Sequence, residues 1–118
     1  MKHNQKIANI GQNIAKNYLI KHGYSILSEN YRVKHCEIDI IANKNEDIYL
    51  IEVKTVLVGK IAPEHQLSYS KKKAMTRARQ LIADKLNIDQ DLILIEFIGV
   101  ILDYSKKMAN IKHFILIY

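Results

Sequence analysis

Residues 37–54 of this 118-residue chain read EIDIIANKNEDIYLIEVK, and they are the most informative stretch of the sequence. Two apolar runs, residues 40–42 and 48–51, contain the β-branched residues that favour strands, and the acidic cluster Glu37-Ile38-Asp39 precedes the first of them. The polar segment Asn43–Asp47 between them has the composition of a turn. Two short apolar runs separated by a few turn residues are typical of a β-hairpin. The stretch therefore predicts two antiparallel strands.

The register of this hairpin brings acidic residues together. If Asn43 pairs with Ile48 around a loop of about four residues, Asp39 falls directly opposite Glu52. Glu52 and Lys54 then project from one face, because side chains alternate along a strand. Two carboxylates about 5 Å apart repel each other, and a divalent cation between them removes that cost. The pattern therefore predicts Mg²⁺ or Mn²⁺ bound to Asp39 and Glu52.

Lys54 adds a third chemical group to this face. Its amine could orient an attacking water or stabilise the charge that develops on a phosphate. Mg²⁺ prefers one or two carboxylates completed by waters and phosphate oxygens, which suits a site with only Asp39 and Glu52. A solvated strand face with a favourable charge pair between Glu52 and Lys54 is the simpler alternative, since short motifs often arise by chance.

An acidic residue, a hairpin turn and Glu-x-Lys together resemble the PD-(D/E)xK nuclease motif. The whole chain resembles the YraN family, small bacterial proteins that are predicted to be nucleases. The positions that carry this resemblance are Gly11, Ala15, Tyr18, Leu19, residues 23–27, 30–32, 37–42 and 51–55, Lys71, Glu96 and His113. The resemblance implies a restriction-endonuclease-like fold and a metal-dependent nuclease with Asp39, Glu52 and Lys54 as catalytic residues.

One position departs from the family pattern in a way that bears on activity. Gln12 stands where the family usually has a glutamate that supports the metal site. An amide carries no charge with which to hold a cation. Three functions therefore stay open: a metal-dependent nuclease acting on DNA or RNA, a nucleic-acid-binding module without turnover, and a protein-interaction subunit.

Glu37 is expected either to support the site or to form a salt bridge with Arg32 or Lys34.

The charge of the chain favours an anionic partner. Its net charge is +6 and its pI is near 9.4. Lys71, Lys72 and Lys73 open a helical stretch that includes Arg77. Basic residues at the start of a helix act with the positive end of its dipole to hold phosphate. We therefore expect these four residues to contact nucleic acid, although a lysine-rich surface exposed to solvent is the alternative.

The apolar patterns predict the order αβββαββ. Apolar residues between Ile7 and Leu19 follow a helical period, and Gly23 is placed to end that helix. A second helix is expected to open at Ser70. The strands are expected at about residues 24–33, 37–43, 48–54, Leu92–Leu102 and Ile111–Tyr118. Near-continuous apolar strands favour a three-layer α/β domain whose mixed central sheet is flanked by helices on both faces.

Composition sets further bounds. The length suits a single domain over residues 1–118. One cysteine, Cys36, excludes an internal disulfide and a multi-cysteine zinc site. We expect a cytoplasmic protein without membrane attachment, because no signal-like apolar stretch follows residues 1–6. An exposed edge strand at residues 111–118 would allow a homodimer.

Glu96, inside an apolar strand, is a second candidate buried acid, although exposure of that position is the simpler explanation.

Overall fold

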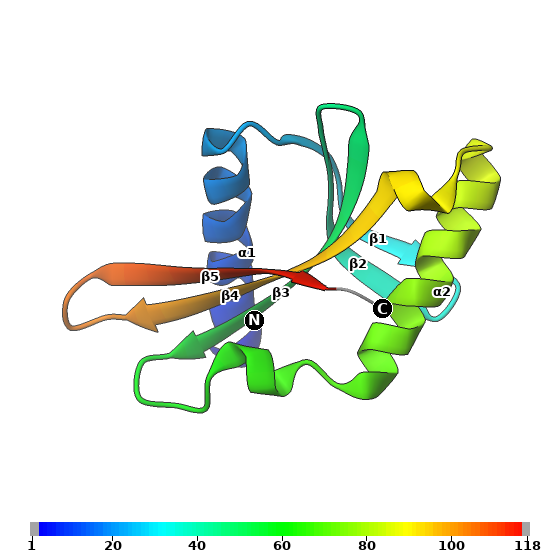
Figure 1. Ribbon diagram of the computed structural model, residues 1–118. Helices are drawn as coiled ribbons and strands as arrows, with labels where there is room; N and C mark the ends of the chain where they lie inside the picture. Colours follow the sequence, from blue (N-terminus) through cyan, green and yellow to red (C-terminus); the bar gives the residue numbers. More distant parts are fainter. Residues whose placement is uncertain (1–2, 117–118) are drawn as a thin grey trace.

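The order αβββαββ is also the order in the computed structural model, which describes residues 3–116. Its architecture is the predicted restriction-endonuclease-like one, with a mixed sheet between helices (Figure 1). The main elements are α1 (His3–Lys21), β1 (Ser25–Val33), β2 (Cys36–Lys44), β3 (Asp47–Leu57), α2 (Tyr69–Leu86), β4 (Ile93–Asp103) and β5 (Met108–Leu116), with short 3-10 helices η1 (Pro63–Gln66) and η2 (Gln90–Leu92).

The sheet has five strands in the order β1-β2-β3-β4-β5. β3 and β4 run parallel, and the other neighbouring strands are antiparallel. A parallel pair needs a long crossover, which here contains η1 and α2. No helix within residues 3–116 is long and apolar enough to cross a membrane.

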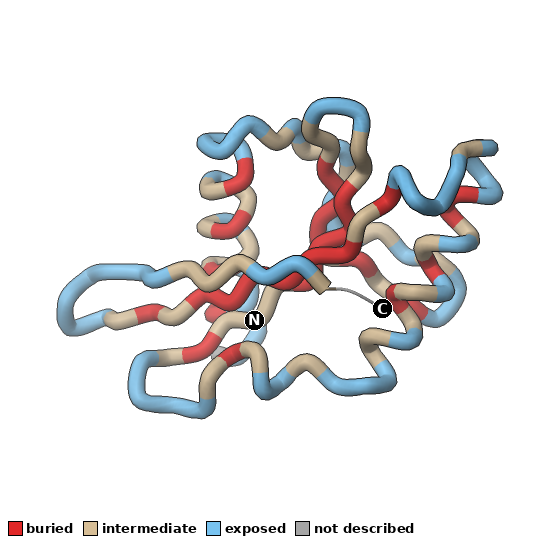
Figure 2. The backbone as a smooth tube through the Cα atoms, in the orientation of Figure 1, coloured by how far each residue is buried: buried red, intermediate tan, exposed pale blue. Residues whose placement is uncertain are grey.

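The two helices cover opposite faces of the sheet, and each face has its own buried core (Figure 2). This is the predicted layering, because both faces of the central strands are apolar. The core on the α1 side contains Ile7, Ala15, Leu19, Ile40, Ala42, Tyr49, Ile51, Ile98, Val100 and Leu102. The core on the α2 side contains Cys36, Ile38, Ile41, Leu50, Met75, Ala78, Ile82, Ala83, Ile93 and Ile95.

Gly23 ends α1, as predicted. Its φ of 90° is a left-handed conformation that side chains disfavour. The Tyr24 N–H donates to the carbonyl of Leu19 at 3.0 Å, and the Gly23 N–H donates to the carbonyl of Ile20 at 3.2 Å. These two bonds form a Schellman motif, which pairs carbonyls at the helix end.

The second helix begins one residue before the predicted Ser70. Ser68 caps it, since its side chain accepts a hydrogen bond from the Lys71 N–H at 3.1 Å. The helix therefore starts at Tyr69 and ends before Asn87, whose φ is 55°.

The hairpin register predicted from residues 37–54 is confirmed. Asn43 pairs with Ile48. The connecting loop is shorter than expected, because Lys44 also pairs with Asp47 and only residues 45–46 remain unpaired. A positive φ of 58° at Asn45 makes this tight turn, a conformation that asparagine tolerates.

Two strands extend beyond their predicted limits. β3 continues past residue 54 to Leu57, because its pairing with β4 continues. β5 begins at Met108 rather than Ile111, because Met108 pairs with Asp103 and lengthens the hairpin into an exposed segment. Main-chain pairing of this kind leaves no apolar pattern in the sequence. The last two residues of the predicted strand, 117–118, lie outside the described residues.

Strand β2 separates from β3 at Asp39, and we call this separation the sheet fork. The ladder ends where Ile40 pairs with Ile51, one step short of the predicted pair of Asp39 with Glu52. Ile38 packs on the α2 side of the sheet whereas Ile40 packs on the α1 side, so side-chain alternation breaks at Asp39. Within residues 3–116, no strand pairing includes Asp39.

Glu96 is buried, with 4% of its surface exposed, so the simpler expectation of an exposed position is wrong. His113 Nε2 lies 2.6 Å from Glu96 Oε1, and the Tyr24 hydroxyl donates to the same oxygen at 3.3 Å. The Tyr18 hydroxyl lies 3.0 Å from His113 Nδ1. Burial and the Glu96 charge raise the pKa of Tyr24 well above its ordinary value. This polar network connects α1 to β4 and β5.

Truncating Glu96 should destabilise the fold strongly, because its partly buried partners, Tyr24 and His113, would lose their acceptor. We expect Glu96→Ala to lower the free energy of unfolding by about 3 kcal/mol. A double-mutant cycle with His113→Ala should give a coupling energy of at least about 1 kcal/mol, measured by urea denaturation. Glu46→Ala in the exposed turn is the matched control. Additive effects of the Glu96 and His113 changes would contradict the network.

Gly11 allows α1 to approach β3 closely. A Cβ atom at this position would overlap the side chain of Thr55. We therefore expect Gly11→Ala to lower the free energy of unfolding by roughly 1–3 kcal/mol. Asn13→Ala, at an exposed position of the same helix, is the control and should have little effect. Unchanged stability of Gly11→Ala would show that the helix is not packed this closely.

Candidate active site

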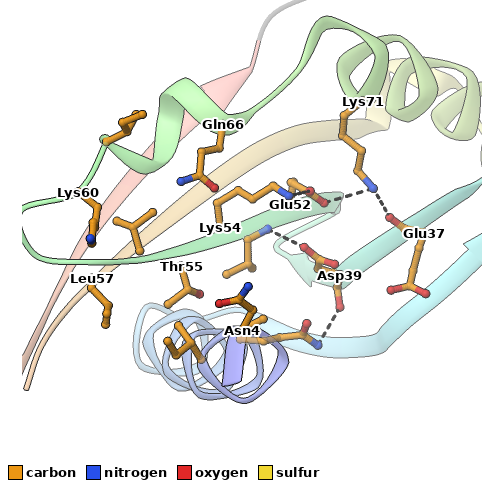
Figure 3. A pocket seen from close by; sticks show the side chains of 16 residues that line it. Asn4, Glu37, Asp39, Glu52, Lys54, Thr55, Leu57, Lys60, Gln66 and Lys71 are labelled. Atoms are coloured by element: carbon orange, nitrogen blue, oxygen red, sulfur yellow. Dashed lines mark hydrogen bonds and ion pairs between the residues drawn. The ribbon is translucent and has the colours of Figure 1, made fainter. Parts of the chain in front are cut away.

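A cavity of about 830 Å³ lies at the sheet fork, a size within the ordinary range of ligand sites. Figure 3 looks into this cavity, with α1 below β3 and the η1–α2 segment above it. The lining residues are Asn4, Ile7, Ala8 and Gln12 of α1, Glu37 and Asp39 of β2, residues 52–57 of β3, Lys60, Ile61 and Gln66 of the following connection, and Lys71 of α2.

The two predicted metal ligands both line the cavity and lie close together. The Val53 N–H donates to Asp39 Oδ2 at 2.8 Å, which keeps this carboxylate beside β3. Glu52 is 3% exposed. Its Oε1 is buried and accepts no hydrogen bond from any residue of the described chain. A buried carboxylate oxygen without a hydrogen bond is costly, and the partner that the described chain offers it is the Lys71 amine, an ion pair at 3.4 Å.

Two lysines approach Glu52 from different elements. Lys71 Nζ lies 3.4 Å from Glu52 Oε1 and donates to the Glu37 carbonyl at 2.6 Å. Lys54 Nζ lies 3.8 Å from Glu52 Oε2. The Lys71 side chain is 25% exposed and that of Lys54 is 38% exposed. Lys71 is therefore the more enclosed of the two amines, and Figure 3 shows it reaching down from α2.

The electrostatics of Glu52 favour its neutral form. Burial, followed by the charge of Asp39, raises the pKa of Glu52 from 4.5 to about 8. The positive charges of Lys71 and Lys54 oppose this shift without cancelling it. A protein carboxyl with so high a pKa holds a proton near neutral pH, and such groups concentrate at functional sites.

Gln12 acts in the structure as a donor. Its Nε2 lies 3.3 Å from the Asp39 carbonyl and 3.3 Å from Glu29 Oε1. Glu29 also pairs with Lys16 at 3.3 Å. A carboxylate in place of this amide would face two acceptors, so the amide suits its surroundings in this chain. Gln12 thereby ties α1 to β2 at the fork.

Glu37 forms the predicted salt bridge with Arg32, at 3.5 Å. Its backbone carbonyl, rather than its carboxylate, takes part in the contacts around Glu52. The Glu37 side chain nevertheless lines the cavity.

The donor set fits a hard divalent cation. No group of three or more His, Cys, Asp or Glu side chains within residues 3–116 could hold a metal ion. Asp39 and Glu52 alone supply two carboxylates, and one Glu52 oxygen still lacks a hydrogen bond. Mg²⁺ and Mn²⁺ accept such a set, because Mg²⁺ usually keeps several waters and uses one or two carboxylates. The cavity has room for those waters.

The predicted nucleic-acid contacts divide into two groups. Lys71 lies in the cavity, whereas Lys72, Lys73 and Arg77 do not line it. Lys73 and Arg77 are exposed on α2, and Lys73 Nζ lies 5.4 Å from the ring centroid of Tyr69. Helical geometry explains the difference, because residues one and two positions beyond Lys71 point to other sides of the helix.

Four residues near the site were not predicted. Asn4, Lys60 and Gln66 line the cavity, and Glu29 holds Gln12. Lys60 and Gln66 belong to the connection after β3, whose residues carry no motif that predicts a site. No spacing in the sequence connects these positions to Asp39, because the fold alone brings them together.

The raised pKa of Glu52 makes the stability of the metal-free protein depend on pH. Between about pH 4.5 and 8 the folded protein holds a proton that the unfolded chain has released, so stability falls as pH rises through this window. Glu52→Gln removes this dependence and should raise the free energy of unfolding at pH 8 by about 2 kcal/mol. Urea denaturation in the presence of a metal chelator, at several pH values, measures the pH dependence of stability and the effect of Glu52→Gln. Glu46→Gln is the control. Equal pH slopes in wild type and Glu52→Gln would contradict the shift.

Comparison with known proteins agrees with the resemblance seen in the sequence. The model of the uncharacterised protein family UPF0102 matches residues 11–98. A UPF0102 protein of Alkaliphilus oremlandii is 36% identical over 110 residues, covering 91% of this chain and 94% of the relative. A UPF0102 protein of Caldicellulosiruptor bescii is 32% identical over 110 residues, covering 92% of both chains. The chain therefore belongs to the UPF0102 family, also called the YraN family.

Proposed function

We propose that this protein is a metal-dependent nuclease that hydrolyses phosphodiester bonds of DNA or RNA. The observation that carries the proposal is the pair of neighbouring carboxylates in the cavity, Asp39 and Glu52. Glu52 is buried beside Asp39, and its Oε1 accepts no hydrogen bond within the described chain. An apolar residue would be more stable at this position than a buried carboxylate, so the arrangement favours a functional role.

Asp39 and Glu52 would hold Mg²⁺ or Mn²⁺. When bound, such a cation acts as a Lewis acid on a phosphoryl oxygen and lowers the pKa of a coordinated water. The hydrogen bond from the Val53 N–H orients the Asp39 carboxylate before any ligand arrives. A ligand that is already oriented loses less entropy on binding.

The two lysines have different places in this mechanism. Lys54, at 3.8 Å from Glu52 and partly exposed, can reach an attacking water or a phosphate oxygen in the cavity. Lys71 neutralises Glu52 from the α2 side and would stabilise negative charge on the phosphate. Lys72, Lys73 and Arg77 lie on the outer surface of the same helix, where they could contact the rest of a polyanion.

A nucleic-acid-binding module without turnover is the second candidate. Gln12 favours it, because this position donates hydrogen bonds to Asp39 and Glu29 and adds no charge to the cation site. The same basic surface would then bind nucleic acid with a strong dependence on salt. A protein-interaction subunit is the third candidate, and the positive net charge would suit an acidic partner.

Cleavage of a mixed panel of labelled DNA and RNA, with and without Mn²⁺ or Mg²⁺, tests the nuclease. We expect metal-dependent cutting that Asp39→Asn reduces by at least about 100-fold, because removing one well-placed charge-stabilising group typically costs that much. Asp91→Asn, at an exposed position of η2, is the matched control. Circular dichroism and Mn²⁺ titration would show that the variants fold and whether they bind the cation.

The outcomes separate the three candidates. Salt-sensitive binding without cutting by the wild type would select the binding module. Mn²⁺ binding that is the same in wild type and Asp39→Asn would reject the cation site. Absence of both nucleic-acid binding and cutting would leave the protein-interaction subunit.

A further inference from the structure

The sheet fork leaves an unpaired strand edge inside the cavity. β3 pairs with β4 as far as Leu57, whereas its pairing with β2 ends at Ile51. Residues 53–57 therefore have a strand neighbour on one side only within the described chain. An unpaired edge presents a row of N–H and C=O groups that can bind another chain. Figure 3 looks onto this edge, with β3 crossing in front of β4.

The alternation of the strand identifies the backbone groups on this edge. The Val53 N–H faces the β2 side, since it donates to Asp39 Oδ2. The Val58 N–H faces the opposite side, since it donates to the Leu102 carbonyl of β4 at 2.8 Å. Backbone groups alternate along a strand, so the N–H groups of Thr55 and Leu57 face the fork with that of Val53.

The spacing and charge of this edge suit phosphates. Two residues along a strand span about 6.6 Å, which is close to the separation of successive phosphates along a nucleic-acid strand. Backbone N–H groups commonly contact phosphate oxygens. Lys54 and Lys60 line the cavity beside this edge, and Lys60 is exposed. All the carboxylates among the lining residues lie at the other end, at Glu37, Asp39 and Glu52.

The walls of the cavity suit bases rather than a closed duplex. The α1 wall contains the exposed Ala8 and the largely buried Ile7, and the β3–α2 connection contributes Ile61. Ile61 is 67% exposed although it is apolar. The faces of paired bases are stacked and hidden, whereas unpaired bases can lie against side chains.

We propose that the open edge of β3 from Val53 to Leu57 is the path of one unpaired nucleic-acid strand. Its phosphates bind the N–H groups of Thr55 and Leu57 and the amine of Lys60. Its bases lie against the apolar walls. This inference rests on the proposed function and names its substrate class, a single strand or a duplex with an unpaired tail. An extended peptide could pair with the same edge, but the lysines favour a polyanion.

Fluorescence anisotropy in Ca²⁺, with labelled DNA of about ten nucleotides, tests this path. A single strand and a duplex with a short unpaired tail should bind at least tenfold more tightly than a blunt duplex. Lys60→Gln should weaken binding of the single strand about threefold to tenfold and reduce the salt slope by about 0.7. Lys106→Gln, in the exposed β4–β5 turn, is the control and should change neither. Neutral methylphosphonate linkages, placed one at a time, should weaken binding at two or more successive positions.

Other results would overturn the inference. If the single strand and the blunt duplex bound with equal affinity and Lys60→Gln had no effect, the path would be rejected. The proposed nuclease function would still stand if Mn²⁺-dependent cutting required Asp39. Binding of an extended peptide of alternating valine and threonine, weakened by Ile61→Ser, would assign the edge to a peptide if single strands did not bind. Absence of binding to any nucleic acid would contradict both the path and the proposed function.

Discussion

The hydrogen bond from the Val53 N–H to Asp39 Oδ2, at 2.8 Å, is the interaction on which the rest of the site depends. A side-chain oxygen takes the place that a main-chain carbonyl of β2 would have if the ladder continued. The bond therefore ends the pairing of two strands without leaving the Val53 N–H unpaired. It also turns the Asp39 carboxylate toward Glu52 and opens the cavity along the remaining edge of β3.

Burying Glu52 beside Asp39 costs electrostatic free energy, and the rest of the fold offsets only part of it. Lys71 and Lys54 lower the charge around Glu52, yet burial and Asp39 still raise its pKa to about 8. A site of this kind is less stable than an apolar one of the same shape, and function is the usual reason for keeping it. A divalent cation would complete the site, because it adds positive charge that Lys71, which also contacts the Glu37 carbonyl, and the partly exposed Lys54 do not supply.

Residues 37–54 sufficed to predict the hairpin, its register and the meeting of Asp39 with Glu52, because alternation and turn chemistry are local. Gly23 likewise revealed the end of α1. The break in alternation at Asp39 was not predictable, since it depends on Ile38 and Ile40 packing against different helices. Lys71 was predicted as a nucleic-acid contact, but its contacts with β2 and β3 were not predicted, because they depend on how α2 docks. The network of Glu96, His113, Tyr18 and Tyr24 joins residues up to 95 positions apart and leaves no spacing signal.

A crystal structure of the protein soaked with Mn²⁺, with anomalous diffraction measured for manganese, tests the central claim most directly. The account predicts one manganese peak within coordination distance of the carboxylates of Asp39 and Glu52, with Lys71 Nζ moved away from Glu52 Oε1. Lys71 still paired with Glu52, with no manganese at the fork at saturating concentration, would contradict it. The buried acid would then be a structural charge pair with α2, and the chemistry of this protein would have to lie elsewhere.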